Sequence, residues 1–144
     1  METLVAGSKA PNITMRDLDG NLFELNKLET QCNYILALFW SAGCSHCVEM
    51  ADNLYPWHQQ QDIRQKIMVL AISLDETKAE IKAWEKKIPD LKGWKHLHAA
   101  EGGRSKAASD YFVLATPVMV LLDAKTKEIV AVPNTLNEVI TATK

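Results

Sequence analysis

Residues 34–47 read YILALFWSAGCSHC, and this stretch decides the fold. Its first half is a continuous apolar run, which is typical of a strand buried on both faces of a sheet. Cys44 and Cys47 follow in Cys-x-x-Cys spacing. A helix is expected from about Ser45 towards Gln61, so the pair stands where a buried strand gives way to a helix.

On both sides of this stretch, strand-like and helix-like segments alternate. Upstream, Asp19-Gly20 separates two short apolar stretches and is typical of a β-hairpin turn. Downstream, Thr77-x-x-Glu80 has the spacing of a capping box, and Asp75 and Thr77 are expected to cap the helix that follows. The remaining expected elements are buried strands at 66–74 and 118–122, short strands at 95–99 and 129–132, and helices at 105–111 and 136–143.

The order of these elements predicts an α/β fold. Strands separated by helices pair in parallel, whereas the tight turn at 123–127 predicts an antiparallel pair near the end of the chain. We therefore expect a single domain over residues 1–144, with a mixed central sheet, helices on both faces and an extra N-terminal β-hairpin. The length fits, because single cores usually run to about 100–200 residues.

The composition is that of an ordinary globular protein. Of 144 residues, 47% are hydrophobic and 24% are charged, which argues against collagen-like, coiled-coil and disordered classes. The 16 basic and 18 acidic residues give a net charge of −2, so the charge gives no reason to expect nucleic-acid binding. No apolar run approaches the roughly 20 residues that cross a bilayer. No secretory segment follows Met1, and an export signal or membrane tether is expected to lie outside this chain.

The Cys-x-x-Cys pair has three interpretations. It could be half of a zinc site, but a closed structural site needs four ligands, and only Cys32 and the four histidines remain to complete one. It could be two buried structural cysteines that happen to be close in sequence. It could be a redox dithiol, which is what a pair that follows a buried strand and opens a helix indicates.

Helix electrostatics favour the redox interpretation. A thiolate is the nucleophile in disulfide exchange, and a helix N-terminus stabilises an anion through its free N–H groups and its dipole. Cys44 would stand at that N-terminus and Cys47 one turn inside, so Cys44 is the expected attacking sulfur and Cys47 the resolving one. His46 lies between them, and if protonated it would stabilise the thiolate further and make the couple more oxidising. A solvated loop histidine is the alternative.

With these features in place, the sequence resembles the thioredoxin superfamily. FWSAGCSHC, residues 39–47, is similar to its active-site segment, and Thr116-Pro117 before the strand VMVLL resembles its cis-proline loop. The segments AGSKAPNITMRDLDGNLFELNKL and ISLDETKAEIKAWEKKI resemble the extra hairpin and inserted helix of TlpA/ResA-type thiol–disulfide oxidoreductases, within the AhpC/TSA redoxin-like group. The resemblance covers nearly the whole chain from about Gly7. Peroxiredoxins share the fold, but residues 43–47 do not match the context of their peroxidatic cysteine well.

The resemblance implies a role for each matching residue. Cys44 is the exposed nucleophile, Cys47 the buried partner, and His46 belongs to the same catalytic set. Pro117 would be cis and would bring the Thr116 backbone beside the cysteines, where an extended substrate peptide can pair with it through β-type hydrogen bonds. Pro117 is therefore counted with the catalytic residues. Substrate contacts are expected from Trp40, Gly43, Thr116 and Pro117.

Three departures from the family pattern stand out. Leu38 occupies the position of a buried Asp that thioredoxins usually carry. Met50 stands where the TlpA/ResA-type branch often has a Glu, and Glu49 comes one place early; since one residue turns a helix side chain by about 100°, Glu49 is expected to face solvent. Gly43 replaces the Trp or Pro often found before the first cysteine. The carboxylate that would move a proton to Cys47 is therefore in doubt.

The other cysteine, the other histidines and the tryptophans are expected to be structural. Trp40 is expected to pack beneath the site, Cys32 to be a free structural thiol, and His58 to be a surface residue. His96 and His98 point to the same face of a short strand, and its solvent face would explain them. Core or rim packing is expected of Trp57, Trp84 and Trp94.

The leading hypothesis is a thioredoxin-like thiol–disulfide oxidoreductase that exchanges disulfides with protein substrates through the Cys-Ser-His-Cys dithiol, in the reductive direction. No cofactor or metal is expected, because the sulfurs carry the electrons. The alternatives are a peroxiredoxin-like thiol peroxidase and a non-catalytic binding domain of a larger exported protein, in which the cysteines and His46 could hold a soft ion such as Cu(I). The resemblance implies a bacterial periplasmic or cell-envelope location. The expected partners are protein disulfides or dithiols and an upstream redox partner.

Overall fold

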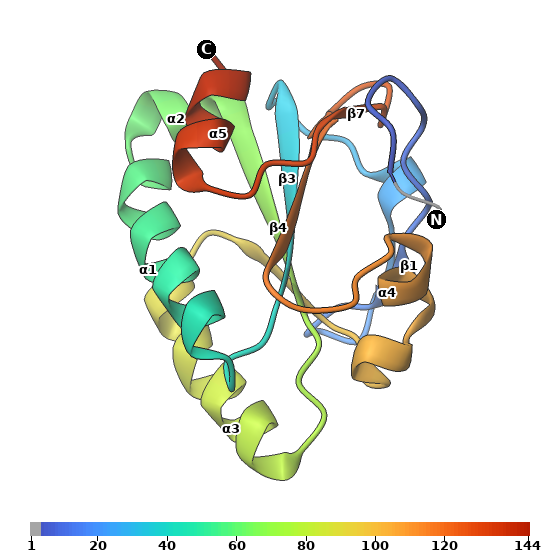
Figure 1. The fold of residues 1–144 in the computed structure, drawn as a ribbon, viewed down its shortest axis with the longest axis vertical. Coiled ribbons are helices and arrows are strands. Elements are labelled where there is room, and N and C mark those ends of the chain that lie inside the picture. The colour runs from blue at the N-terminus through green and yellow to red at the C-terminus, as the bar shows by residue number, and fades with distance from the viewer. Residues whose placement is uncertain (1–3) are drawn as a thin grey trace.

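A five-stranded mixed sheet with the strand order β5-β4-β3-β6-β7 forms the centre of the molecule, and a separate hairpin, β1-β2, lies beside it (Figure 1). The computed structural model describes residues 4–144. The strands are β1 (Thr14–Arg16), β2 (Leu22–Glu24), β3 (Tyr34–Trp40), β4 (Ile67–Ser73), β5 (Lys95–His98), β6 (Val118–Asp123) and β7 (Ile129–Ala131). The helices are α1 (Ser45–His58), α2 (Gln61–Lys66), α3 (Lys78–Lys87), α4 (Lys106–Asp110) and α5 (Leu136–Ala142), with 3-10 turns η1 (Leu25–Lys27), η2 (Ile88–Leu91) and η3 (Gly102–Arg104).

β3 lies in the middle of the sheet because its apolar side chains must be covered on both faces. It pairs in parallel with β4, from Tyr34 opposite Ile67 to Trp40 opposite Ser73, and antiparallel with β6. β4 and β5 are parallel, and β6 and β7 are antiparallel. The predicted mixed α/β sheet is confirmed, and the carboxyl ends of β3 and β4 meet at the same edge.

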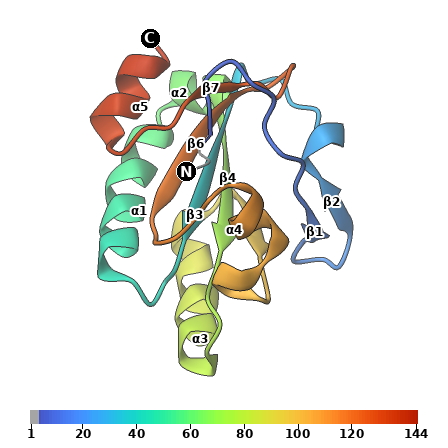
Figure 2. The same cartoon turned by 45° about the vertical axis from the view of Figure 1, so that its right-hand side comes forward.

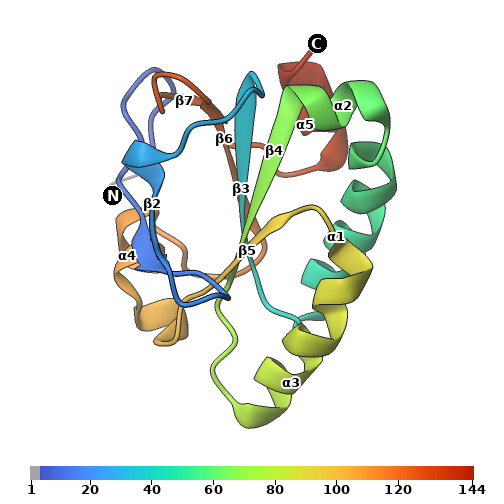
Figure 3. The ribbon, with the colours of Figure 1, turned by 180° about the vertical axis from the view of Figure 1, so that it is seen from behind.

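Two hydrophobic layers form on the two faces of the sheet, because successive side chains of a strand point to opposite faces. The odd-numbered residues of β3 join the cluster that the β1-β2 hairpin and α4 cover. The even-numbered residues join the cluster beneath α1, α3 and α5. Figure 2 shows the hairpin and α1 on opposite sides of the sheet, and Figure 3 shows the same arrangement from behind. Helices thus cover both faces, although α4 shares its face with the hairpin.

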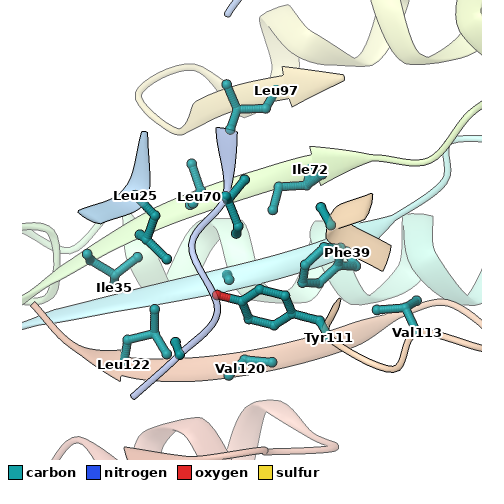
Figure 4. Packing of buried hydrophobic residues seen from close by; sticks show 14 of the residues in the cluster. Leu25, Ile35, Phe39, Leu70, Ile72, Leu97, Tyr111, Val113, Val120 and Leu122 are labelled. Atoms are coloured by element: carbon teal, nitrogen blue, oxygen red, sulfur yellow. The ribbon is translucent and has the colours of Figure 1, made fainter. Parts of the chain in front are cut away.

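Two long-range contacts hold the N-terminal segment against the sheet. Tyr111 is buried, with its ring centroid 5.1 Å from that of Phe39, and its hydroxyl donates to the Pro11 carbonyl oxygen at 2.6 Å (Figure 4). Burial raises the pKa of Tyr111, so this hydroxyl stays a donor over the physiological range. Lys95 of β5 contacts the Asp17 carboxylate at 3.2 Å and fixes the hairpin turn at the sheet edge.

The helix ends mostly follow the local signals in the sequence. Thr77 caps α3 in a complete capping box with Glu80, as predicted. Asp75 does not cap this helix, contrary to expectation, because its carboxylate is buried and is turned towards the loop that follows β3. The helix expected to run towards Gln61 ends at His58, and α2 starts separately because the residue before it has extended backbone angles.

His58 lies in the core, so the expectation that it is a surface residue is wrong. Its ring Nε2 donates to the Ile67 carbonyl oxygen at 2.6 Å, and its Nδ1 accepts from the Trp94 indole N–H at 3.0 Å. His96 is also buried, with Nε2 3.0 Å from the Leu91 carbonyl oxygen, so the solvent face does not explain it. Burial lowers the pKa of both histidines, because the charged form loses its hydration.

We expect the protein to lose stability as the pH falls below about 6.5, the ordinary histidine pKa. Because the pKa values of His58 and His96 are lowered in the folded state, the unfolded chain binds more protons below that pH. The free energy of unfolding then falls by about 1.4 kcal/mol per pH unit for each proton bound only after unfolding. Urea unfolding at neutral and mildly acidic pH measures this. A His58→Gln variant should show a shallower pH dependence, and an equal dependence would contradict this account.

Candidate active site

Cys44 stands at the junction between β3 and α1, at the sheet edge where β3 and β4 end. It is the N-cap residue of α1, with extended backbone angles of φ −108° and ψ 118°. The N-cap side chain lies beside the unpaired N–H groups of the first helical turn. The Cys44 thiol is partly exposed, whereas Cys47, one turn inside the helix, has no exposed surface. The site therefore contains one accessible and one buried free thiol.

The surroundings of Cys44 favour its thiolate form. Burial alone would raise the pKa of this thiol, but hydrogen bonds outweigh burial and hold the pKa below its ordinary value. These bonds come from the backbone N–H groups of Cys47 and His46, from the Cys47 thiol and from the Thr116 side chain. The Cys44 sulfur lies 3.9 Å from the Thr116 carbonyl oxygen. Cys44 is thus the cysteine of the pair that ionises first.

Cys47 has the opposite environment. Burial raises its pKa to about 11, and the neighbouring Cys44 also raises it, against smaller opposing effects from Thr116 and Ser41. At pH 7 only about one Cys47 thiol in 10,000 would then be ionised. This asymmetry favours Cys44 as the attacking sulfur and Cys47 as the resolving one.

The Thr116–Pro117 peptide bond is cis, and the loop that contains it lies beside Cys44. A hollow of about 290 Å³, lined in part by His46, adjoins Pro117. Another hollow of about 270 Å³, lined in part by Phe112, also adjoins Pro117. Pro117, the neighbour of Thr116, therefore borders two hollows that could receive the side chains of an extended peptide.

Two further residues singled out from the sequence take different places. His46 is exposed on the first turn of α1 and lines the hollow beside Pro117. Trp40 has no exposed surface and belongs to the cluster beneath α1. Because a fully buried side chain does not reach a substrate, the expectation of a substrate contact from Trp40 is corrected. Trp40 packs beneath the site, which was the other role expected of it.

The residues that depart from the family pattern near α1 supply no buried carboxylate. Glu49 is exposed on the helix, in line with its one-residue offset, and Met50 is half-buried. Leu38 is fully buried in the cluster beneath α1. None of these three side chains provides a carboxylate beside Cys47.

A buried carboxylate does lie at the site, and the sequence analysis missed its place there. Asp75 follows β4 and has no exposed surface. Its oxygens accept hydrogen bonds from the Ser41 hydroxyl at 2.5 Å, the Ser73 hydroxyl at 2.6 Å and the Ala42 backbone N–H at 3.1 Å. The sequence did hold a signal for it, since Asp75 directly follows the buried strand expected at 66–74, which corresponds to β4 and pairs in parallel with β3.

A close approach from α3 explains why a glycine precedes the first cysteine. A Cβ atom added at Gly43 would lie 2.9 Å from Cγ of Glu80, which is closer than van der Waals contact allows. Glu80 is held in this position by its capping box with Thr77. A larger side chain at position 43 would therefore collide with Glu80 at the start of α3.

Metal ligands do not gather in the part of the chain that the structure describes, where no group of three or more His, Cys, Asp or Glu side chains could hold an ion.

Cys32 lies at the opposite end of β3 from Cys44, with its sulfur 3.4 Å from the Arg64 carbonyl oxygen, and it is a free thiol. Among the helices within residues 4–144, none is long and apolar enough to cross a membrane.

The fold and the dithiol together define a class: proteins with a thioredoxin-type α/β core and a Cys-x-x-Cys pair where the central strand meets its helix. A model of the family described as thioredoxin-like matches residues 32–129. The chain therefore belongs to the thioredoxin-like family. A search of curated proteins found no match.

Solved structures share this fold over nearly the whole chain. The thioredoxin domain of a thiol-disulfide oxidoreductase from Bacteroides vulgatus is 26% identical with a TM-score of 0.77, covering 99% of this chain and 100% of that one. A domain of a possible thiol-disulfide isomerase from Cytophaga hutchinsonii is 27% identical with a TM-score of 0.77, covering 98% and 92%. A thiol:disulfide interchange protein from Bacteroides sp. is 27% identical with a TM-score of 0.74, covering 96% and 87%. These similarities and the extra hairpin agree with a TlpA-type thioredoxin-like protein.

Proposed function

We propose that this chain is a thiol–disulfide oxidoreductase that exchanges disulfides with protein substrates through Cys44 and Cys47, in the reductive direction. The observation that carries the proposal is the contrast between a partly exposed Cys44, whose pKa is lowered, and a fully buried Cys47, whose pKa is raised to about 11. Such a pair separates the attacking sulfur from the resolving one. The similarity to proteins named as thiol-disulfide oxidoreductases supports the same assignment.

The proposed reaction consists of two disulfide exchanges. The Cys44 thiolate attacks one sulfur of a substrate disulfide, which forms a mixed disulfide and releases the other substrate sulfur as a thiolate that takes up a proton. Cys47 then loses its proton and attacks the Cys44 sulfur. This step forms the Cys44–Cys47 disulfide and releases the second substrate sulfur, which is protonated in turn. The substrate disulfide gains two electrons and two protons, and the protein dithiol supplies the electrons.

The substrate would bind along the loop beside Cys44. An extended segment can pair with the backbone of Thr116 next to Pro117, and its side chains can enter the two hollows there. Gly43, which has no side chain, leaves the approach to Cys44 open. His46 lines one hollow and, when protonated, would stabilise the Cys44 thiolate.

We infer a location in the bacterial periplasm or cell envelope, where disulfides form and persist. The named relatives come from Bacteroides and Cytophaga. A catalytic reductant must itself be reduced again, so an upstream dithiol partner would return the Cys44–Cys47 disulfide to the thiol form. In this proposal, both the disulfide substrate and the upstream dithiol partner are proteins rather than small cofactors.

The test is the redox potential of the Cys44–Cys47 couple, measured in a Cys32→Ser background by equilibration with glutathione, thiol alkylation and mass spectrometry. A value near that of thioredoxin, about −270 mV, supports a reductase. A value of about −120 to −180 mV would reverse the proposed direction and indicate an oxidase or isomerase. A pair that forms no reversible disulfide would overturn the function. A Cys44→Ser variant is the control that must show no couple.

A further inference from the structure

The loop between β3 and Cys44, residues 41–43, is hydrogen-bonded to one buried carboxylate, that of Asp75. Besides the bonds from Ser41 and Ala42, the backbone N–H of Gly43 lies 3.4 Å from Oδ1 of Asp75. All three residues of the loop between β3 and Cys44 therefore donate towards the same side chain. Ser41 also bears on the second cysteine, because its backbone lowers the pKa of Cys47, against the larger effect of burial.

Asp75 is itself fixed from the other side. The Ser73 hydroxyl donates a hydrogen bond to the Asp75 carboxylate at 2.6 Å and accepts one from the Asp75 backbone N–H at 3.2 Å. The carbonyl oxygen of Asp75 accepts a hydrogen bond from Nε2 of His98 at 2.7 Å, and the His98 ring stacks on Trp84 with centroids 4.8 Å apart. Both carboxylate oxygens accept hydrogen bonds from this network. Asp75 is thus a rigidly held, fully buried acidic side chain next to the dithiol loop.

We propose that Asp75 is a positioning residue for the dithiol: it holds residues 41–43 so that Cys44 stays at the helix N-terminus, and its buried charge favours the thiol forms of the pair and makes the couple more reducing. This inference rests on the function proposed above. A fixed negative charge near a thiolate opposes its formation, and in a buried site this effect is weakly screened. Destabilising the thiolate destabilises the reduced form, which lowers the reduction potential.

The other titratable groups around Cys44 do not duplicate this charge. On α1 they are His46 and Cys47, with Glu49 exposed on the same helix. On α3, Glu80 lies against Gly43 but is partly exposed. The loop at 116–117 opposite Cys44 carries no charged side chain. Asp75 is therefore the one fully buried carboxylate among these groups of the described structure.

The test compares Asp75→Asn with the parent protein in the Cys32→Ser background. The amide keeps the shape and removes the charge, so the pH profile of Cys44 alkylation should move down by about one unit, which is about tenfold more thiolate at a given acidic pH. The equilibrium with glutathione should shift about tenfold towards the dithiol, equivalent to about 30 mV. Ser73→Ala is the matched control, because it removes one donor to Asp75 but keeps its charge and the loop contacts. This control should show neither shift.

Unchanged alkylation and glutathione profiles in Asp75→Asn, or the same shift in Ser73→Ala, would overturn the inference and leave Asp75 a purely structural residue. If Asp75→Asn does not fold, Ser41→Ala decides instead: it frees the loop and keeps the charge, so glutathione exchange at Cys44 should slow relative to Ser73→Ala. Equal rates would overturn the proposal. Alkylation of the reduced protein needs no disulfide cycling, so this measurement tests Asp75 even if the proposed function fails.

Discussion

A Cys44→Ser variant should exchange disulfides at least about a thousandfold more slowly than the parent protein, whereas Cys47→Ser should react once and stop as a mixed disulfide. The reason is the difference between the two thiols. Cys44 is accessible and its pKa is lowered by N–H groups of α1, while Cys47 is buried and its pKa is raised to about 11. Without Cys44, the other thiol of the pair, Cys47, is almost never ionised at neutral pH and lies out of reach of a substrate.

Mass spectrometry after mixing with a peptide disulfide distinguishes the two variants. In a Cys32→Ser background, Cys47→Ser should carry one covalently bound half of the peptide, released by reductant, and Cys44→Ser should carry none. Cys32→Ser is the matched control, because its sulfur lies at the other end of β3 against the Arg64 carbonyl oxygen. It should exchange at the parental rate. If Cys44→Ser formed the stable adduct instead, the assignment of attacking and resolving sulfurs would be reversed.

Local signals in the sequence predicted most of the fold. The apolar run of β3, the Asp19-Gly20 turn and the Thr77–Glu80 capping box each depend on residues close together in the chain, and each element is found where it was expected. The alternation of strands and helices correctly predicted which strands are parallel. The placement of Cys44 at the start of α1 follows from the same local pattern.

The features that the sequence analysis missed depend on contacts between distant residues. Ser41 and Asp75 are 34 residues apart, and His58 and Trp94 are 36 apart. Parallel pairing of β3 and β4 brings the first pair together, because the residues that follow two neighbouring parallel strands emerge at the same edge. His58 was also within reach of helical periodicity, since it continues the buried positions 47, 51 and 54 of α1.

A Trp40→Ala substitution should lower the free energy of unfolding by about 3–5 kcal/mol, a large share of the roughly 5–15 kcal/mol that holds a typical domain folded. Trp40 is among the largest fully buried side chains, at the end of the central strand. It belongs to the same buried cluster as Cys47 and Leu38. Removing the indole leaves a cavity between the sheet and α1, and rigid neighbours fill such a cavity only in part.

The cavity should also change the chemistry of the dithiol, which separates Trp40 from an ordinary core residue. Burial is the main cause of the high pKa of Cys47, so water admitted by Trp40→Ala should lower that pKa and speed Cys47 alkylation at mildly alkaline pH. Trp40→Phe is the matched control, because it keeps an aromatic ring and removes an indole N–H that finds no acceptor within residues 4–144. Its stability cost should be about half or less. Urea unfolding followed by circular dichroism measures the stability of both variants, and alkylation followed by mass spectrometry measures the reactivity of Cys47. Equal losses of stability in Trp40→Ala and Trp40→Phe, with unchanged Cys47 reactivity, would show that Trp40 does not shield Cys47 from water.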